Sequence, residues 1–195
     1  MSNETRPLPK NLFLTGTPGV GKTTLIKEVT LPYLDRVAGF YTEELKEGPE
    51  RKGFWMKSFM PLSSGLSGGL LAKKGMKSPT KLGKYGVDMK ILEGVGAAAL
   101  SEAMARSGTV LVIDELGSME VLSDLFRKKL LECLQSKGHP VLATIRFNAQ
   151  PFTGHVKRLA DSALLRLTRE NFVETKTEVR RWLEGQLLSN KSQGQ

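Results

Sequence analysis

The sequence predicts an α/β fold, in which a mostly parallel central sheet is flanked by helices and carries a small antiparallel hairpin extension. Three observations predict this class. A glycine-rich loop at 16–23 lies between an apolar run and a segment of helical periodicity. A second apolar run, 110–113, is followed directly by two carboxylates. Strand and helix patterns alternate along most of the chain, as in domains built around a parallel sheet.

The first elements enclose the glycine-rich loop and then form a hairpin. We expect a strand over 11–15 and a helix over 21–31. Two further strands, 37–42 and 51–59, are joined across Lys46-Glu47-Gly48-Pro49, which has the composition of a hairpin loop. A hairpin is not a β-α-β unit, so these strands predict the antiparallel extension.

The segment 61–86 is rich in glycine, serine and lysine, which predicts a long irregular or extended insertion. Much of the net charge of +9 lies in or just after it, in Lys73, Lys74, Lys77, Lys81, Lys84 and Lys90, interrupted only by Asp88. We interpret these lysines as a solvated surface. The alternative is a positive field that steers an anion toward a site.

The rest of the chain returns to the alternation of strands and helices. We expect helices over 88–106, 118–137, 151–160 and 170–188. We expect strands over 109–115, 140–145 and 163–168. Ser118 is the expected N-cap of the second of these helices, and Gly138 its C′ residue.

Residues 1–195 are predicted to form one domain, because this length can bury a single core and has little room for two. We expect the folded core over about 10–188 and flexible ends at 1–9 and 189–195. No run is long and apolar enough to cross a bilayer, and Met1–Lys10 lacks the apolar stretch of a signal peptide.

The cysteine and histidine content argues against disulfide and metal-cluster chemistry. The single Cys133 has no partner in the sequence, which favours a reducing, cytoplasmic setting. His139 and His155 lack metal-ligand spacing with other histidines, cysteines or carboxylates, so we expect both to be structural or exposed.

The loop Gly16–Thr23 fits the pattern GxxxxGK[ST], which cradles phosphates when it joins a strand to a helix. Its glycines allow backbone N–H groups to converge on an anion at a helix N-terminus. Lys22 is expected to reach the β- and γ-phosphate oxygens, and the Thr23 hydroxyl to bind Mg²⁺. The expected nucleotide-binding residues of this stretch are Gly16, Thr17, Pro18, Gly19, Val20, Gly21, Lys22, Thr23 and Thr24, the last of which packs or caps. The alternative is a chance glycine-rich turn.

Asp114 and Glu115 follow four apolar residues, Val110–Ile113, that are typical of a strand buried on both faces of a parallel sheet. Such a strand places its C-terminal carboxylates at the edge where α/β sheets bind ligands. We expect Asp114 to hold Mg²⁺, directly or through water. We expect Glu115 to orient and deprotonate a water that attacks the γ-phosphate, so Glu115 and Lys22 are the predicted catalytic residues. An ordinary strand-end turn is the alternative.

Further motifs point to a particular family. They run in order along the chain as Leu14–Gly16 through Thr23–Leu25, Gly39–Glu44, Arg51–Phe54, Gly83–Val87, Val112–Glu120 and Val141–Ile145. On these stretches the sequence resembles the small nucleoside-triphosphatase family of the THEP type, which includes the cancer-related nucleoside-triphosphatase. The phosphate loop is common to a large superfamily, whereas the Gly39–Glu44 and Val112–Glu120 stretches are much more particular.

The resemblance implies a RecA-like P-loop NTPase fold. It also implies slow, Mg²⁺-dependent hydrolysis of ATP, GTP, CTP and UTP to diphosphate and phosphate, with loose base preference. The stretch Gly16–Thr23 would then bind the triphosphate. The second nucleotide-contacting stretch would be Val110, Leu111, Val112, Ile113, Asp114, Glu115, Leu116 and Gly117.

Two residues at and just after the end of the next strand are weaker candidates. Arg146 is either an arginine finger that stabilises charge in the transition state or a surface residue. Thr144 is a candidate sensor of the γ-phosphate or the attacking water. Phe40 and Tyr41 are expected to be core residues in preference to a base-stacking platform.

Two other functions compete with hydrolysis. A nucleoside or nucleotide kinase with an unidentified phosphoryl acceptor shares the loop and the size, but such kinases usually carry an arginine-rich lid, and here the insertion is rich in lysine. A nucleotide-gated nucleic-acid-binding module fits the basic charge, but no nucleic-acid motif is recognisable, so nucleic acid is not the expected partner. Segment 145–186 lacks the NKxD element of guanine-selective switches. We expect a monomer that does not associate with membranes.

Overall fold

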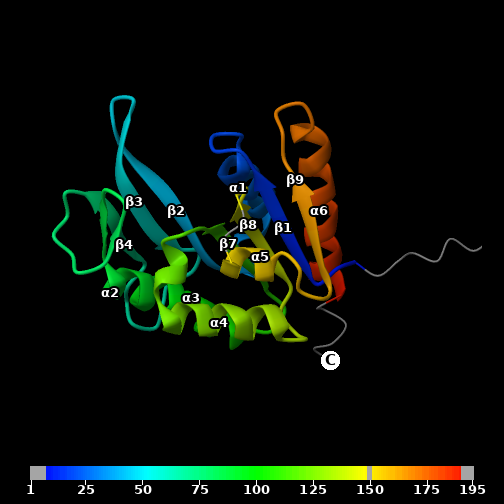
Figure 1. Ribbon diagram of the computed structural model, residues 1–195. Coiled ribbons are helices and arrows are strands. Elements are labelled where there is room, and N and C mark those ends of the chain that lie inside the picture. Colours follow the sequence, from blue (N-terminus) through cyan, green and yellow to red (C-terminus); the bar gives the residue numbers. More distant parts are fainter. Residues whose placement is uncertain (1–7, 149–150, 190–195) are drawn as a thin grey trace, which may run out of the picture.

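The computed structural model describes residues 8–148 and 151–189. Within them the chain forms one nine-stranded sheet with helices on both faces (Figure 1). The strands are β1 (Asn11–Gly16), β2 (Val37–Glu47), β3 (Glu50–Ser58), β4 (Gly68–Lys74), β5 (Lys81–Leu82), β6 (Tyr85–Val87), β7 (Val110–Leu116), β8 (Val141–Arg146) and β9 (Ser162–Arg166). The helical segments are α1 (Lys22–Thr30), the 3₁₀ segment η1 (Leu31–Arg36), α2 (Met89–Ile91), the π-helical segment η2 (Leu92–Ala97), α3 (Ala98–Met104), the 3₁₀ turn η3 (Glu120–Leu122), α4 (Asp124–Gln135), α5 (Pro151–Val156) and α6 (Phe172–Ser189).

The strands lie in the order β5-β6-β4-β3-β2-β7-β8-β1-β9. Five neighbours, β2, β7, β8, β1 and β9, are paired in parallel, which confirms the predicted mostly parallel sheet. The carboxyl ends of parallel strands meet at one edge of a sheet. The segments that follow β1, β7, β8 and β9 therefore come together, although they are far apart in the sequence.

Strand β7 shows why a core forms on both faces of the sheet. Successive side chains of a strand point to opposite faces. Val110 and Val112 pack in the cluster formed with α1 and α6, whereas Leu111 and Ile113 pack in the cluster formed with α3 and α4. All four are buried, as expected for a central parallel strand.

Strands β3, β4, β5 and β6 continue the sheet in antiparallel order, and we call them the antiparallel lobe. The lobe is larger than the small hairpin extension predicted, because part of segment 61–86 joins it as β4, β5 and β6. Its glycines serve close packing between strands. A Cβ at Gly68 would lie 2.6 Å from the Met56 carbonyl oxygen, and one at Gly86 would lie 2.2 Å from the Met76 carbonyl oxygen.

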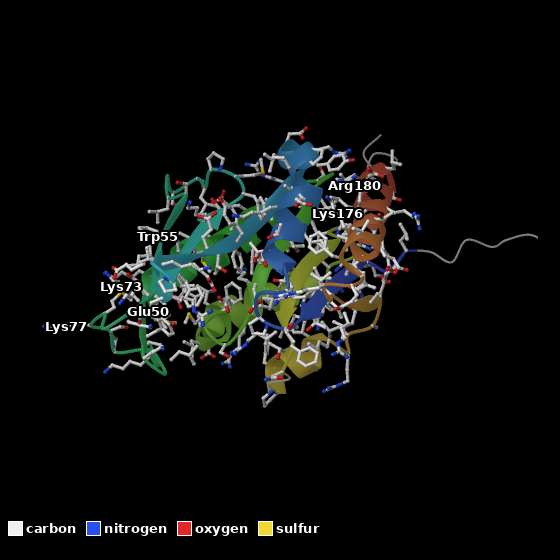
Figure 2. All side chains as sticks on the ribbon, turned by 90° about the horizontal axis from the view of Figure 1, so that it is seen from above. Glu50, Trp55, Lys73, Lys77, Lys176 and Arg180 are labelled. Carbon is white, nitrogen blue, oxygen red and sulfur yellow. The ribbon has the colours of Figure 1, made fainter. Side chains whose placement is uncertain are left out.

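The lysines of this segment lie on the antiparallel lobe. Figure 2 shows Lys73 and Lys77 on the lobe, at the opposite side of the molecule from Lys176 and Arg180 on α6. Lys74 pairs with Glu50, whose carboxylate also lies 2.7 Å from the Lys52 ammonium. This pairing on an exposed surface favours the interpretation of a solvated face over that of a steering field.

The helix predicted over 88–106 forms in three parts. It begins with α2, where the Asp88 carboxylate accepts hydrogen bonds from the backbone N–H groups of Lys90 and Ile91. It continues through the π-helical segment η2 and ends with α3. Gly94 and Gly96 both lie in this π-helical segment, so these two glycines coincide with a local change of helix type.

The helix predicted over 118–137 begins later in the structure than predicted, at Asp124. Ser118 is not its N-cap: the chain first forms η3, and α4 begins only after Ser123, whose hydroxyl accepts a 3.1 Å hydrogen bond from the Phe126 N–H. The reason is the Glu120 carboxylate, which accepts from the Gly117 N–H at 2.9 Å and keeps this stretch in a tight turn. The helix also ends at a Ser136 C-cap instead of at Gly138.

The other helix and strand ends differ from the predicted ends by a few residues. Helix α5 ends at Val156 and strand β9 at Arg166. Most of the ends predicted to be flexible, residues 1–7 and 190–195, lie outside the described residues. Pro9 is held by α6, because its carbonyl oxygen accepts hydrogen bonds from the side chains of Trp182 at 2.7 Å and Gln186 at 3.0 Å. Among the described residues, no helix combines the length and the hydropathy needed to cross a bilayer.

Candidate active site

The phosphate loop connects β1 to α1 in the conformation that its glycines allow. Gly19 and Gly21 have φ angles of 76° and 105°, in the left-handed region that favours glycine. Gly16 is fixed by space instead, since a Cβ there would lie 2.6 Å from the Leu167 carbonyl oxygen. Helix α1 has no side-chain cap at Gly21, so its first backbone N–H groups remain available to an anion.

Lys22 joins the phosphate loop to the acidic pair. Its ammonium donates to the Gly16 carbonyl oxygen at 3.2 Å and lies 3.3 Å from a Glu115 carboxylate oxygen. The lysine side chain is 9% exposed, whereas that of Glu115 is 34% exposed. The loop after β1 and the carboxylates of β7, distant in sequence, therefore form one site.

Asp114 is buried at the centre of this site, with 1% of its surface exposed. Its Oδ1 accepts a hydrogen bond from the Thr144 hydroxyl, while its Oδ2 is buried and has no hydrogen-bond partner. Burial raises the pKa of Asp114 above its ordinary value, and the neighbouring Thr144 and Thr23 hydroxyls oppose the rise. The peptide bond between Asp114 and Glu115 is cis.

The oxygens around Asp114 fit a magnesium ion. Mg²⁺ prefers oxygen ligands and usually takes only one or two from protein carboxylates and hydroxyls, the others coming from phosphates and water. The unpartnered Oδ2 of Asp114 and the neighbouring Thr23 hydroxyl match that requirement. Over the residues described, no group of three or more histidines, cysteines and acids forms a different metal centre.

A second buried acid, Glu120, supports the turn beside Glu115. Its carboxylate is 6% exposed and accepts from the Gly117 N–H at 2.9 Å. Burial raises the pKa of Glu120 to about 7, and the nearby Glu115 carboxylate adds to the rise while Arg146 opposes it. Glu120 lies inside a motif that the sequence singles out, but its pattern of neighbours gave no sign that it faces inward.

The two weaker candidates occupy different environments. Thr144 is fully buried, and its hydroxyl donates a hydrogen bond to Asp114, the predicted metal ligand. Arg146 is exposed at the end of β8, and its guanidinium donates to the Ser118 hydroxyl beside the Gly117 turn.

The other predicted residues divide between core and loop. Val110, Leu111, Val112, Ile113 and Leu116 are buried in the core, so from this stretch the carboxylates and the Gly117 turn are what reach the site. In the phosphate loop, Thr17, Pro18, Gly19 and Thr24 are exposed, and Val20 is half-buried. Phe40 is buried and packs against Phe126 with ring centroids 5.6 Å apart, which confirms its core role, and Tyr41 packs against Phe59.

The structure adds a segment that the sequence analysis missed. Residues 166–170, the last residue of β9 and the four residues after it, line a hollow together with loop residues 17–20. The Leu167 N–H donates to the Thr15 carbonyl oxygen at 2.7 Å, which ties this segment to the phosphate loop. The only sequence signal was its place after a short strand, and that pattern does not say which strand is the neighbour.

A family model described as NTPase matches residues 11–180. The chain belongs to this NTPase family. Among the curated relatives, the nucleoside-triphosphatase THEP1 of Thermotoga maritima is 38% identical over 162 residues, which are 82% of this chain and 87% of the relative. The human cancer-related nucleoside-triphosphatase is 34% identical over 180 residues, covering 84% of this chain and 91% of that protein.

Solved structures agree with this assignment to the NTPase family. The crystal structure of THEP1 from Aquifex aeolicus matches with a TM-score of 0.78 and 30% identity, covering 89% of this chain and 99% of that chain. The solution structure of a human cancer-related nucleoside triphosphatase matches with a TM-score of 0.70 and 33% identity, over 87% and 94% of the two chains. Together they confirm the predicted resemblance, the P-loop NTPase fold and the enzyme class, a nucleoside-triphosphatase.

Proposed function

We propose that this protein hydrolyses ATP, GTP, CTP and UTP to the diphosphate and phosphate, in a Mg²⁺-dependent reaction with loose base preference. The observation that carries the proposal is the 3.3 Å contact between Lys22 and Glu115, beside the buried Asp114. This contact supports the proposal because it joins the lysine of the phosphate loop to the solvent-accessible carboxylate that follows Asp114. We also propose a monomeric enzyme in the cytoplasm, where its one cysteine would stay reduced.

The phosphate loop binds and orients the triphosphate. Backbone N–H groups at the start of α1 donate to phosphate oxygens, and the Lys22 ammonium adds charge-assisted hydrogen bonds. A bound triphosphate competes with the Gly16 carbonyl and the Glu115 carboxylate for this ammonium. Binding therefore frees the Glu115 carboxylate for another partner.

Asp114 and Thr23 would hold the magnesium ion. When bound, the ion neutralises charge on the β- and γ-phosphate oxygens. The Thr144 hydroxyl keeps one oxygen of Asp114 occupied, and the other oxygen would be available to hold the ion. Thr144 thus acts as a positioning residue for Asp114.

Glu115 orients the attacking water and accepts its proton. The water oxygen forms a bond to the γ-phosphorus, the bond from that phosphorus to the bridging oxygen breaks, and the diphosphate leaves with the bonding electrons. The proton then passes from Glu115 to the phosphate or to solvent. Because the Arg146 guanidinium is engaged with Ser118, we expect turnover on the order of 10⁻⁴ to 10⁻² s⁻¹, as for unstimulated P-loop enzymes.

The experiment that tests the proposal is incubation of the purified protein with Mg-ATP alone. We expect release of phosphate and ADP in equal amounts, and the same for the other three nucleotides within a narrow range of rates. Phosphate transfer only in the presence of a nucleoside or nucleotide would instead indicate a kinase. Hydrolysis that requires DNA or RNA and is lost at high salt would indicate a nucleic-acid-dependent module.

A further inference from the structure

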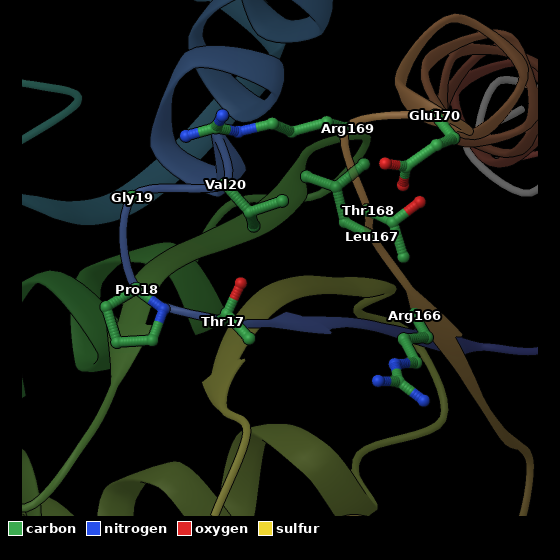
Figure 3. Close-up of a pocket in the computed structure, with 9 residues that line it drawn as sticks. All are labelled: Thr17, Pro18, Gly19, Val20, Arg166, Leu167, Thr168, Arg169 and Glu170. Carbon is green, nitrogen blue, oxygen red and sulfur yellow. The ribbon is translucent and has the colours of Figure 1, made fainter.

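The hollow beside the phosphate loop has a volume of about 290 Å³, close to the lower end for small-ligand pockets. One wall is the loop itself, residues 17–20, and the other is the segment 166–170 (Figure 3). The same loop residues thus form part of the phosphate cradle and part of this hollow. A ligand whose phosphates lie in the loop can reach the hollow without leaving the protein surface.

The order of the strands determines which part of the substrate reaches the hollow. The sheet runs β7-β8-β1-β9, so the phosphate loop after β1 lies between the carboxylates of β7 and the segment that follows β9. The metal and the attacking water belong to the side of Asp114 and Glu115, so the γ-phosphate points that way. The other end of the triphosphate, which carries the nucleoside, then points toward residues 166–170.

The segment 166–170 is held rigidly against the loop. Asn171 fixes its backbone: the Asn171 side chain accepts from the Thr168 N–H at 2.8 Å and donates to the Arg166 carbonyl oxygen at 2.9 Å. A Cβ at Gly21 would lie 3.0 Å from the Phe172 ring, so α6 also begins in contact with the loop. The hollow is therefore formed before a ligand binds.

Within the hollow, Arg169 is the side chain suited to contact a base. Figure 3 shows it extended over the loop at Val20. Arg166 is engaged elsewhere, since its guanidinium carbon lies 5.0 Å from the centre of the Phe147 ring. Among the described residues, Arg169 makes no hydrogen bond or salt bridge, and its charge acts on the neighbouring Glu170 carboxylate. A guanidinium packs well on the flat face of any aromatic ring.

We infer that the ribose and base of the substrate bind in the hollow between residues 17–20 and 166–170, with the Arg169 guanidinium packed on the base. This inference rests on the proposed function and names the part of the site that contacts the base. The residues lining the hollow include no aromatic ring, and its charged side chains are exposed. A guanidinium can stack on any of the four bases. Such a contact would explain the loose base preference that we propose.

Binding measurements with and without the nucleoside test this inference. We would measure dissociation constants for ATP, GTP, CTP, UTP and inorganic tripolyphosphate with Mg²⁺, in a Glu115→Gln background that limits hydrolysis. Arg169→Ala should weaken all four nucleotides about 3- to 30-fold and leave tripolyphosphate within about twofold. Arg169→Lys should show the same loss for nucleotides, because lysine keeps the charge but not the planar group. Arg180→Ala, which removes an exposed arginine of α6 outside the hollow (Figure 2), should change neither.

The possible failures are distinct. Equal weakening of tripolyphosphate by Arg169→Ala would mean that Arg169 binds phosphate, and full rescue by lysine would mean that only its charge matters; either result overturns the inference. Unchanged nucleotide affinity in Arg169→Ala would place the base elsewhere. If the parent protein binds neither nucleotides nor tripolyphosphate, the proposed function itself fails.

Photolabelling gives an independent test. After irradiation with 8-azido-ATP, whose reactive group is on the base, we expect mass spectrometry to find the label in the peptides that contain residues 17–20 or 166–170. Labelling of the antiparallel lobe in place of these peptides would overturn the inference.

Discussion

The two sides of the phosphate loop differ in how firmly their side chains are held. On the side of β7 and β8, Asp114 and Thr144 are buried and hydrogen-bonded to each other. On the side of β9, Arg169 and Glu170 are exposed on the rim of an open hollow. Phosphoryl transfer needs fixed groups around the γ-phosphate, whereas recognition of any base needs adaptable contacts. The comparison teaches that, under the proposed function, one loop would join a rigid site for phosphoryl transfer to an adaptable site for the base.

Glu115→Gln gives the largest expected effect and tests the chemical side. We expect kcat to fall by about 10² to 10⁴, the usual range for loss of a general base, while the dissociation constant for Mg-ATP changes little. Single-turnover hydrolysis and equilibrium binding on the same preparation would measure both. If turnover stays near that of the wild type, another group positions the water.

Glu120→Gln probes the buried acid behind the Gly117 turn. Folding raises the pKa of Glu120 from 4.5 to about 7, so between these pH values the folded protein retains a proton that the unfolded chain releases. The wild type therefore has this stability in full below pH 4.5 and loses it as the pH rises through 7. At pH 8 the glutamine variant should be more stable by up to about 3 kcal/mol, and near pH 4.5 the two should be similar.

Urea denaturation at several pH values would measure this difference. The control is Glu178→Gln, which changes an exposed acid of α6 and should follow the wild type at every pH. A Glu120→Gln variant with the same pH dependence as the wild type would contradict a raised pKa at this position.

Lys22→Ala removes the group that connects the loop to the acidic pair. Hydrogen bonds to charged groups contribute about 1.5–3 kcal/mol, so we expect nucleotide affinity to fall by about 10- to 150-fold. Hydrolysis should fall as well, since the proposed role of this lysine is to contact the γ-phosphate. Isothermal titration with a non-hydrolysable triphosphate would measure the affinity, and an unchanged value would count against the proposed cradle.

Arg146→Ala has the smallest expected effect. It tests whether Arg146 belongs to the catalytic residues on the side of β7 and β8. Its guanidinium donates to Ser118 and lies beside the Gly117 turn, so we expect a loss of tenfold or less in kcat. An arginine finger would cost about 10³ to 10⁵. Steady-state kinetics with Mg-ATP separates the two, and a loss in the larger range would make Arg146 a catalytic residue.

The sequence was informative where chemistry depends on local pattern. Gly16, Gly19 and Gly21 could be placed because a phosphate loop needs open backbone and positive φ angles, and Asp114 and Glu115 because they end an apolar strand. Ser118 was misjudged as a helix cap, because the 2.9 Å bond from the Gly117 N–H to Glu120 overrides the local capping preference.

Features that depend on which strands are neighbours could not be predicted. The parallel pairing of β1 with β9 brings residues 166–170 beside the phosphate loop, although the two segments are far apart in the sequence. Pairing of β4 with β3 likewise turned a glycine-rich stretch into sheet, since glycine in a strand and glycine in a loop look alike in sequence. Both depend on tertiary contacts that no local pattern records.

The central claim is that Asp114, Thr23, Lys22 and Glu115 act together on one triphosphate. A crystal structure with Mg²⁺ and a non-hydrolysable triphosphate tests it most directly. We predict the ion bound to the Thr23 hydroxyl and, directly or through water, to Asp114 Oδ2, with the γ-phosphate on Lys22 and a water between it and Glu115. A triphosphate bound in the loop with its γ-phosphate directed away from Asp114 and Glu115 would contradict the account.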